Sequence, residues 1–466
     1  MEKLKKYEDA FAKIKGIYIF VFVTYILLSR IVPLVNFISQ DLNSVIYSAL
    51  AITGAVLVAF DFFMSFSIFK SRENIILLVF WVICLISSLL NMKYGIVNNV
   101  KTLVWMAIQF FLFFSFVNTK DKEINKTLKL IMNSSAAIWL AGVIASLVEF
   151  FLQISYIAPA SDFPRRQGFT EARLFGVFTD PNFAALTSML VIVFCLFLIK
   201  YCDSKKLRIY YWVNIAFQLI YIVLSGSRTA MLEGYMLVFF TAIVQARNAA
   251  IKKGQGSRAL LSIARGVLAV AVSIALVFAV QKTMPFLAEL CAPLRDSITI
   301  EIDEDINEED IISLERHDVN EENISNNRFS IWKSAIEVSQ GKRIFGVSPR
   351  NLLSYATEEF PDSYLVRMDY ETHNGYLALF VNSGIMGTLA MLVLIVDVIR
   401  LICRYLKCKK KQEYDSEVIM LFSVLFIIAG SAIFQPEIFF VNSYGAAIFW
   451  LCLGYFMYFL KKKTEA

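Results

Sequence analysis

Three segments of the chain carry the residues best suited to chemistry, and each places arginine next to small or polar residues. They span residues 165–182, 225–229 and 327–375. Arginine presents a planar fork of donors that matches phosphate, and histidine titrates close to neutral pH. The candidate ligands and base are Arg165, Arg166, Arg173, Arg228, Arg328 and His373. This combination indicates a site that holds a phosphorylated group beside a general base.

The first segment ends in a pattern that is typical of the start of a helix. Asp180 is a good N-cap and Pro181 a favoured first helical residue, so the simplest interpretation is that they begin a helix that continues with Asn182. Upstream, Arg173 is followed by Gly176, where the backbone can approach a ligand closely.

The other arginines of the first two segments have simpler alternative explanations. Arg165 and Arg166, each taken alone, are typical of a solvated loop. Arg228 follows Ser227 in the sequence Ser-Gly-Ser-Arg-Thr, and Glu233 lies about one helical turn further on. One interpretation is a structural Arg228–Glu233 pair, or an arginine that reaches the lipid headgroups. The other is an anion site in which helix N-terminal amides, two hydroxyls and the guanidinium bind phosphate.

The third segment ends in the candidate base. His373 comes directly before Asn374, a plausible helix cap, with Tyr376 two residues later. It is either a hydrogen-bonding residue at a helix end or a general base near neutral pH. Asp369 and Glu371 precede it, and either carboxylate can orient the ring or raise its pKa. Either carboxylate can also be the base itself, with His373 then donating to the leaving group.

Between these motifs lies a polar stretch of about ninety residues with two different halves. Residues 301–322 are strongly acidic and predict a mobile, solvated flap. The spacing of apolar residues predicts a helix over 326–340 that packs against the membrane domain or a small core of the loop. Its expected cap is Asn326 or Asn327, and its expected buried face consists of Phe329, Trp332, Ala335 and Ile336. The acidic residues lack the glycine turn and spacing of a calcium site, so we expect no metal and no cofactor.

Composition determines what must position these motifs. Hydrophobic residues make up 58% of the 466, charged residues only 18%, and mean hydropathy is +0.60. Soluble chains average about 25% charged residues. A water-soluble globule cannot cover so much apolar surface, and the same figures exclude disorder, collagen and a disulfide scaffold. The sequence therefore predicts an all-α polytopic membrane protein.

Twelve apolar runs have about the length of a transmembrane helix. They lie at 17–35, 45–64, 74–91, 97–117, 129–153, 183–200, 209–224, 229–246, 265–281, 375–399, 416–434 and 439–460. The expected division is nine spans over residues 1–281, one large outer loop over 282–372, and three spans with a C-terminal tail over 373–466.

The distribution of positive charge orients this arrangement. With both termini in the cytoplasm, 29 of the 45 Lys and Arg residues fall on the inner side and only six in short outer loops. All three motif segments then lie outside. The basic residues form short clusters between apolar runs, which argues against nucleic-acid binding. Ionisable residues within the spans are too scattered for the proton relay of a secondary transporter; they are Arg30, Asp61, Glu149 and Asp397.

The order of the motifs resembles that of the O-antigen ligase/polymerase family of bacterial membrane glycosyltransferases. The motifs are Arg173-Leu-Phe-Gly176, Ser-Gly-Ser-Arg228-Thr, Arg328-x3-Trp332, Gly346, His373-Asn374-x-Tyr376 and Gly384-x2-Gly387. The resemblance covers roughly residues 165–400 and includes the large outer loop. One departure is Ser348, where the family often has a second glycine.

The resemblance implies transfer of a glycan from an undecaprenyl-diphosphate carrier to an acceptor hydroxyl, at the outer face of the bacterial cytoplasmic membrane. The resemblance also implies that no metal or nucleotide sugar takes part. It implies that Arg173, Arg228 and Arg328 hold the diphosphate and that His373 activates the acceptor. We expect Arg165 and Arg166 to add to substrate binding. The expected supporting residues are Asp180, Asn182, Ser227, Glu233, Asp369, Glu371, Asn374 and Tyr376.

Three functions remain to be distinguished. The leading hypothesis is a polymerase of a surface polysaccharide such as O-antigen, capsule or exopolysaccharide, working with a flippase and a chain-length regulator. The second is a ligase that moves the finished chain to a lipid core, a wall polymer or a protein. The third is a lipid-glycan flippase or transporter, which would not need a long outer loop with arginines at both edges.

Overall fold

The computed structural model describes residues 2–465 except 66–68, 70, 119–120, 159–164, 255–258, 292 and 294–326. The protein is an all-α polytopic membrane protein, as its composition predicts. Within the described residues, eleven helices are long and apolar enough to cross a membrane. They are α1 (Glu2–Leu28), α3 (Gln40–Ser65), α4 (Arg72–Leu90), α5 (Val97–Ile108) with its continuation to Val117, α6 (Asp121–Phe151), α7 (Pro181–Lys200), α8 (Lys205–Leu224), α9 (Arg228–Lys252), α10 (Ala259–Leu290), α15 (Gly375–Cys408) and α17 (Tyr444–Glu465).

These helices overlap eleven of the twelve predicted spans, and the differences lie at their ends. The predicted span 416–434 corresponds to α16 (Ser416–Ser431), whose 16 residues are fewer than the roughly 20 of a usual span. A loop over 435–443 separates α16 from α17, so the last helix begins at Tyr444 rather than at 439. The ninth predicted span ends at 281, whereas α10 continues to Leu290 through Pro285.

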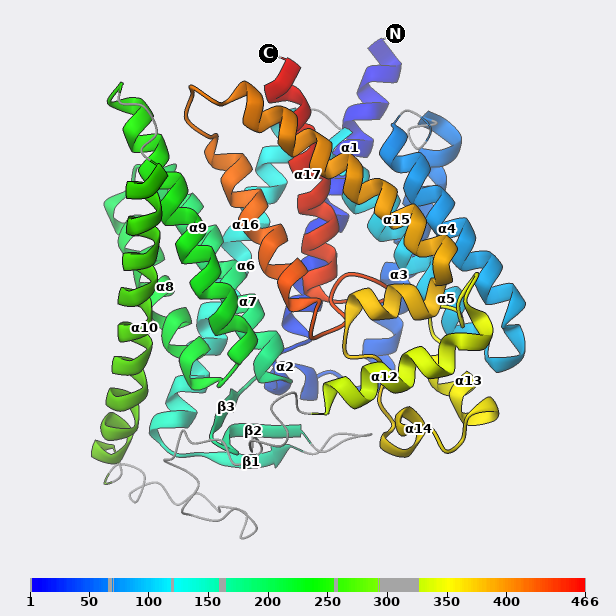
Figure 1. Cartoon of the computed structure of the whole chain (residues 1–466), viewed down its shortest axis with the longest axis horizontal. Helices are drawn as coiled ribbons and strands as arrows, with labels where there is room; N and C mark the ends of the chain where they lie inside the picture. Colours follow the sequence, from blue (N-terminus) through cyan, green and yellow to red (C-terminus); the bar gives the residue numbers. More distant parts are fainter. Residues whose placement is uncertain are drawn as a thin grey trace.

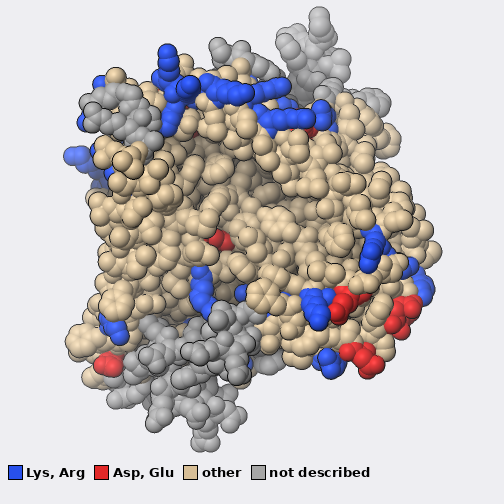
Figure 2. Space-filling model, viewed as in Figure 1, with Lys and Arg blue, Asp and Glu red and all other residues tan. Residues whose placement is uncertain are grey.

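The two ends of the molecule differ in content (Figure 1). Both termini lie at one end, and the only described strands lie at the other, near the helices of the 327–372 segment. Figure 2 shows a broad surface band with few charged residues between two charged rims, and the rim at the end of the termini is rich in Lys and Arg. An uncharged band between charged rims fits a protein that crosses a lipid bilayer.

The helices pack around a single large apolar core. Most side chains of α7 and α17 are buried, whereas α10 exposes apolar side chains along nearly its whole length. At the end of the core opposite the termini, Trp139 of α6 stacks on Phe178, which lies just before α7, with ring centroids 4.2 Å apart. The α7 N-terminus is therefore anchored in the core.

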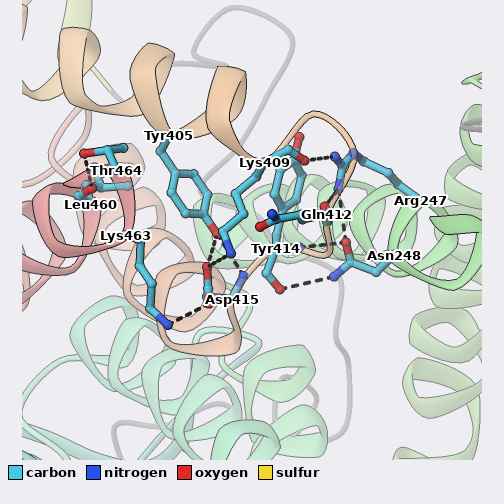
Figure 3. A network of polar contacts seen from close by, with 10 residues as sticks. All are labelled: Arg247, Asn248, Tyr405, Lys409, Gln412, Tyr414, Asp415, Leu460, Lys463 and Thr464. Atoms are coloured by element: carbon cyan, nitrogen blue, oxygen red, sulfur yellow. Dashed lines mark hydrogen bonds and ion pairs between the residues drawn. The ribbon is translucent and has the colours of Figure 1, made fainter. Parts of the chain in front are cut away.

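A polar network joins α9, the α15–α16 connection and α17 at the end that holds the termini (Figure 3). Arg247 donates to the carbonyl oxygen of Lys409 at 2.6 Å, and its guanidinium lies over the Tyr414 ring. Asp415 accepts ion pairs from Lys409 and Lys463 at 3.1 and 2.9 Å. These contacts hold the short α16 in place from the side away from the motifs.

The segment between α6 and α7 forms a small antiparallel sheet, although its sequence predicts a loop. Its strands are β1 (Ser155–Ala158), β2 (Arg165–Thr170) and β3 (Arg173–Gly176), in the order β1-β2-β3. Glu171 and Ala172 make the β2–β3 turn with positive φ angles of 52° and 55°. The pairing places Arg173 opposite Thr170, at the end of the hairpin.

Gly176 allows β3 to pack closely against α6, whereas the sequence suggests a close approach of the backbone to a ligand. Its φ is +60°, and a Cβ atom here would lie 2.1 Å from Oγ of Ser146 in α6. The absence of a side chain therefore lets β3 pack on α6, rather than letting the backbone approach a ligand.

The outer segment after residue 326 folds into short helices with a small core of their own. They are α12 (Arg328–Val338), η6 (Ser339–Lys342), α13 (Leu352–Glu359) and α14 (Tyr364–Met368). Their core also includes Tyr94, from the α4–α5 connection, and Val381 of α15. These helices are therefore packed onto the membrane domain. The predicted flap over 301–322, and Asn326, lie outside the described residues.

The predicted helix is present as α12, but its predicted buried face is partly wrong. Ile331, Ala335 and Val338 are buried, whereas Phe329 and Ile336 are exposed. Both apolar stripes fit the helical period, and the one that faces α14 and α15 is buried. Asn327 precedes the helix with φ +61° and makes no side-chain cap.

The backbone conformation of residues 343–348, after η6, shows why Ser348 stands at a position where the resembled family often has glycine. Residues 343–348 hydrogen-bond to the backbone of α15 around Gly384, where φ is +64° and the helix is interrupted. Ser348 donates from its amide to the carbonyl oxygen of Asn382 at 3.0 Å and has φ +80°. Glycine favours such a φ, so a serine occupies a glycine-type position in this turn.

Candidate functional site

The first two predicted segments meet through the side chain of Arg173. Its Nε donates to the carbonyl oxygen of Ser225 at 2.9 Å, and one terminal nitrogen donates to Oδ1 of Asn182 at 2.7 Å. One half-buried guanidinium thus bridges β3, the first turn of α7 and the α8–α9 turn. Neither contact is visible in sequence spacing, because Ser225 lies 52 residues away.

The residues around Pro181 begin α7, as the helix-start interpretation predicts. Asp180 is extended and its Oδ1 accepts from the amide of Phe183 at 2.8 Å. Asn182 has a second function, since it holds Arg173. The two supporting residues therefore act on the structure of the site in different ways, one as a cap and one as a positioning residue.

The α8–α9 turn presents Arg228 at the start of a helix. Gly226 has φ +62°, and Oγ of Ser227 accepts from the amide of Ala230 at 3.5 Å as the N-cap of α9. Arg228 is the first residue of α9 and its side chain is exposed. Because the side chain of Arg173 donates to Ser225, it reaches the same turn from which Arg228 begins α9.

The alternative of an Arg228–Glu233 pair is not found, although both residues are described. Glu233 is buried one turn into α9 and packs against Gly430 of α16. Its Oε1 has no hydrogen-bond partner in the part of the chain that the structure describes. The carboxyl group lies on the α16 side of α9, within electrostatic reach of Glu437.

His373 lies at the N-terminus of α15 in a left-handed conformation, with φ +43°. Asn374 is the N-cap, and its Oδ1 accepts from the amides of Tyr376 and Leu377, both at 2.9 Å. The imidazole is exposed and meets the Tyr370 ring edge-on at 5.4 Å between centroids. The predicted cap is thus correct, and it leaves the histidine ring outside the helix.

The electrostatic surroundings keep the imidazole neutral. Partial desolvation and the nearby cation of Arg328 lower the pKa of His373 from its usual 6.5, against the opposite effects of Glu371 and Asp180. A histidine with a lowered pKa is unprotonated at neutral pH and can accept a proton. These interactions also place Arg328, from α12, and Asp180, from the start of α7, in the neighbourhood of the ring.

The two neighbouring carboxylates do not orient the ring as predicted. No hydrogen bond joins His373 to Asp369 or Glu371, all three of which are described. Glu371 instead pairs with Arg350 at 3.3 Å, and Asp369 is exposed. The pKa of His373 is lowered overall, because desolvation and Arg328 outweigh the carboxylate.

The remaining predicted residues have more local contacts. Tyr376 donates to the carbonyl oxygen of Ala429 at 2.8 Å and ties α15 to α16. Arg328 lies over the Phe434 ring, 5.3 Å from its centroid. Arg166 pairs with Glu171 within its own hairpin, where both side chains are about half exposed. The side chain of Arg165 lies outside the described residues.

Sequence reasoning missed the loop over 435–443, which lies between these groups. Glu437 is buried there and accepts from Oγ of Ser443 at 2.9 Å. Burial raises the pKa of Glu437 to about 7, and Arg30 counteracts part of the rise. The signal available in the sequence was a carboxylate next to Pro436, between two apolar runs. Among the described residues, no group of three or more His, Cys, Asp or Glu could hold a metal ion.

Comparison with known families matches residues 213–392 to the family described as O-antigen ligase. The matched region runs from within α8 to within α15, and it contains Arg228, Arg328 and His373. Over this region the chain is similar to the O-antigen ligase family. The resemblance inferred from the motifs is thereby confirmed. The family consists of membrane glycosyltransferase-type enzymes, so an O-antigen ligase/polymerase-type function follows in general terms. No curated protein matches the chain.

Proposed function

We propose that this protein transfers a glycan from an undecaprenyl-diphosphate carrier to a hydroxyl group of an acceptor glycan. The observation that carries the proposal is that the side chain of Arg173 reaches the turn that carries Arg228, while His373 lies within electrostatic reach of Arg328 and of Asp180 at the start of α7. Two guanidinium groups beside a helix N-terminus suit a diphosphate. Arg328 adds a third positive charge beside His373.

The proposed reaction needs only proton transfer and charge stabilisation. His373 accepts the proton of the acceptor hydroxyl as its oxygen forms a bond to the anomeric carbon of the donor sugar. The bond from that carbon to the phosphate oxygen breaks, and undecaprenyl diphosphate leaves with both electrons. The arginines stabilise the charge that develops on this leaving group. The residues of the site are thus sufficient without a metal, a cofactor or a nucleotide sugar.

The proposed location is the outer face of the bacterial cytoplasmic membrane, with both termini in the cytoplasm. The charge count over the inner segments supports this orientation, as does the position of both termini opposite the candidate site. In these terms the membrane part comprises residues 1–290, since α10 continues to Leu290, and residues 373–466, with the outer part between them. The bilayer supplies the lipid-linked donor directly to the site.

Two outcomes of the transfer are proposed. The first is polymerisation of a surface polysaccharide, in concert with a flippase and a chain-length regulator. The second is ligation of a finished chain to a lipid core, wall polymer or protein. The glycans of a deletion strain distinguish them: single lipid-linked repeat units support a polymerase, and long unattached chains support a ligase.

The experiment for the shared chemistry uses purified protein in lipid nanodiscs with a synthetic lipid-diphosphate-linked repeat unit and an acceptor glycan. Release of the lipid diphosphate together with elongated or transferred glycan supports the proposal. An unchanged donor in the presence of folded protein contradicts it and favours a non-enzymatic flippase.

A further inference from the structure

We propose that a cavity beside the His373 segment is the acceptor subsite, and that it recognises a negatively charged sugar. This inference rests on the proposed function and specifies its acceptor class. The cavity measures about 480 Å³ and is lined by Arg30 in the α1–α2 connection, by α5, by Arg350 and by the loop that connects α16 to α17. Sites for small ligands typically measure about 300–1,000 Å³.

The charged groups of the cavity favour an anion. Arg30, Lys101 and Arg350 line it, against the single carboxyl group of Glu437. Within the described residues, the guanidinium of Arg30 makes no hydrogen bond or ion pair, and it lies over the Phe183 ring at 4.7 Å. The pKa of Glu437 is raised to about 7, so this carboxyl group is only partly ionised at neutral pH. The cavity therefore carries a net positive charge.

The uncharged groups of the cavity favour a sugar. Oδ1 of Asn442 is buried and has no hydrogen-bond partner among the described residues. It can accept a hydrogen bond from a hydroxyl group, as can Glu437. Trp105 adds an aromatic face to the lining. Hydroxyl acceptors, an aromatic ring and unpaired cations together match a hydroxylated ring that bears a carboxylate or phosphate substituent.

The backbone around the cavity connects it to the proposed base. Arg350 pairs with Glu371, two residues before His373. A second, much smaller cavity, lined by Arg350, Glu371 and Thr372, shares residues of the 436–441 segment with the large one. The same connection joins α15 through the bond from the amide of Gly375 to the carbonyl oxygen of Ala432, at 2.7 Å. An acceptor in the cavity thus lies next to the segment that carries the base.

The cavity lies apart from the elements that carry the proposed diphosphate site. Arg173 and Arg228 belong to β3 and α9, whereas most of the cavity is built from α5 and the loop before α17. Figure 1 shows β3 and α9 on one side of this loop and α5 on the other. Gln109, in the π-helical turn after α5, donates to the carbonyl oxygen of Val441 at 2.8 Å and holds the loop against α5. Donor and acceptor would therefore be held largely by different elements.

The test is a binding measurement that does not depend on turnover. Ligand-observed NMR on protein in nanodiscs compares methyl glucuronide with the neutral methyl glucoside. We expect the glucuronide to bind more tightly, and the double variant Arg30→Gln/Lys101→Gln to weaken it about ten- to hundred-fold. The control Lys333→Gln/Arg367→Gln removes two exposed positive charges, of α12 and α14, that do not line the cavity, and should leave binding unchanged.

A second arm separates an acceptor sugar from the carrier diphosphate, which is also anionic. Farnesyl diphosphate should lose affinity in Arg228→Ala and keep it in the Arg30/Lys101 double variant. If the double variant weakens farnesyl diphosphate as strongly as the glucuronide, the cavity is a diphosphate site and the proposal is overturned. Unchanged glucuronide binding overturns it too.

If the Arg30→Gln/Lys101→Gln variant fails to fold, the exposed Arg350 can be replaced instead. We expect Arg350→Gln to weaken glucuronide binding less than the double variant would. Unchanged binding in that folded variant then counts against the proposal. Failure of catalysis alone would concern the proposed function and not this subsite, because sugar binding is measured without transfer.

Discussion

The Nε of Arg173 donates a hydrogen bond of 2.9 Å to the carbonyl oxygen of Ser225, so a hairpin arginine is fixed to the turn that begins the Arg228 helix. This contact joins two segments that are separated by two transmembrane helices, α7 and α8. It fixes the guanidinium of Arg173 beside the turn that carries Arg228 before any ligand binds. Such preorganisation is what a site for developing negative charge requires.

Removal of either arginine should weaken transfer strongly. A hydrogen bond to a charged group contributes about 1.5–3 kcal/mol, which corresponds to a roughly ten- to hundred-fold loss for Arg173→Ala or Arg228→Ala. Lysine at either position should rescue poorly, since it offers a point charge in place of a planar fork. The measurement is kcat/KM with a lipid-diphosphate donor, and Arg265→Ala on α10 serves as control. Full activity in folded Arg228→Ala would reduce that residue to a structural role.

Asn182 should matter only through Arg173. In Asn182→Ala the guanidinium loses the acceptor 2.7 Å away, and we expect an approximately ten-fold fall in kcat/KM. The same substitution in an Arg173→Ala background should have little further effect, because the partner is already absent. Additive losses in this double-mutant cycle would show that Asn182 acts independently.

The pH profile should report the surroundings of His373. Its pKa lies below the usual 6.5, so activity should persist below that pH and fall only when the imidazole becomes protonated. Arg328→Gln removes a cation that disfavours the imidazolium, so the acidic limb of the kcat profile should move to higher pH. Glu371→Gln should move it to lower pH. Lys333→Gln, also on α12, is the control. An acidic limb that stays in place in both variants would assign it to another group.

Much of this architecture follows from sequence because lipid imposes it directly. A bilayer requires long apolar helices, so the spans are readable from run length, and the order of the motifs indicates the family. The contacts between segments that are distant in sequence depend on how the helices pack, which the sequence pattern does not indicate. The contact of Arg173 with Ser225 depends on how α7 and α8 pack, and the buried face of α12 depends on its neighbours, since Ile331 and Phe329 lie on equally apolar stripes. Glu437 and Arg30 become neighbours only when the first helix meets the loop before the last one.

The hairpin that holds Arg173 should be sensitive to a side chain at Gly176. In Gly176→Ala the new Cβ would meet Oγ of Ser146 at 2.1 Å, in addition to adopting a φ of +60°. Gly254→Ala is a matched control, because its φ is +66° and nothing lies within 4 Å. We expect the free energy of unfolding to fall by about 1–3 kcal/mol more in Gly176→Ala than in Gly254→Ala. Equal effects would mean that only the backbone conformation matters and that β3 moves away from α6 at little cost.

The central claim is that His373 accepts the proton of the acceptor hydroxyl, and His373→Gln tests it most directly. Glutamine keeps a hydrogen-bond donor but has no basic nitrogen. Single-turnover transfer should fall by about 10²–10⁴-fold in this variant, while binding of the lipid-diphosphate donor is retained. Near-normal turnover in folded His373→Gln would contradict the account and assign the base to a carboxylate, with Asp369 and Glu371 the nearest in sequence.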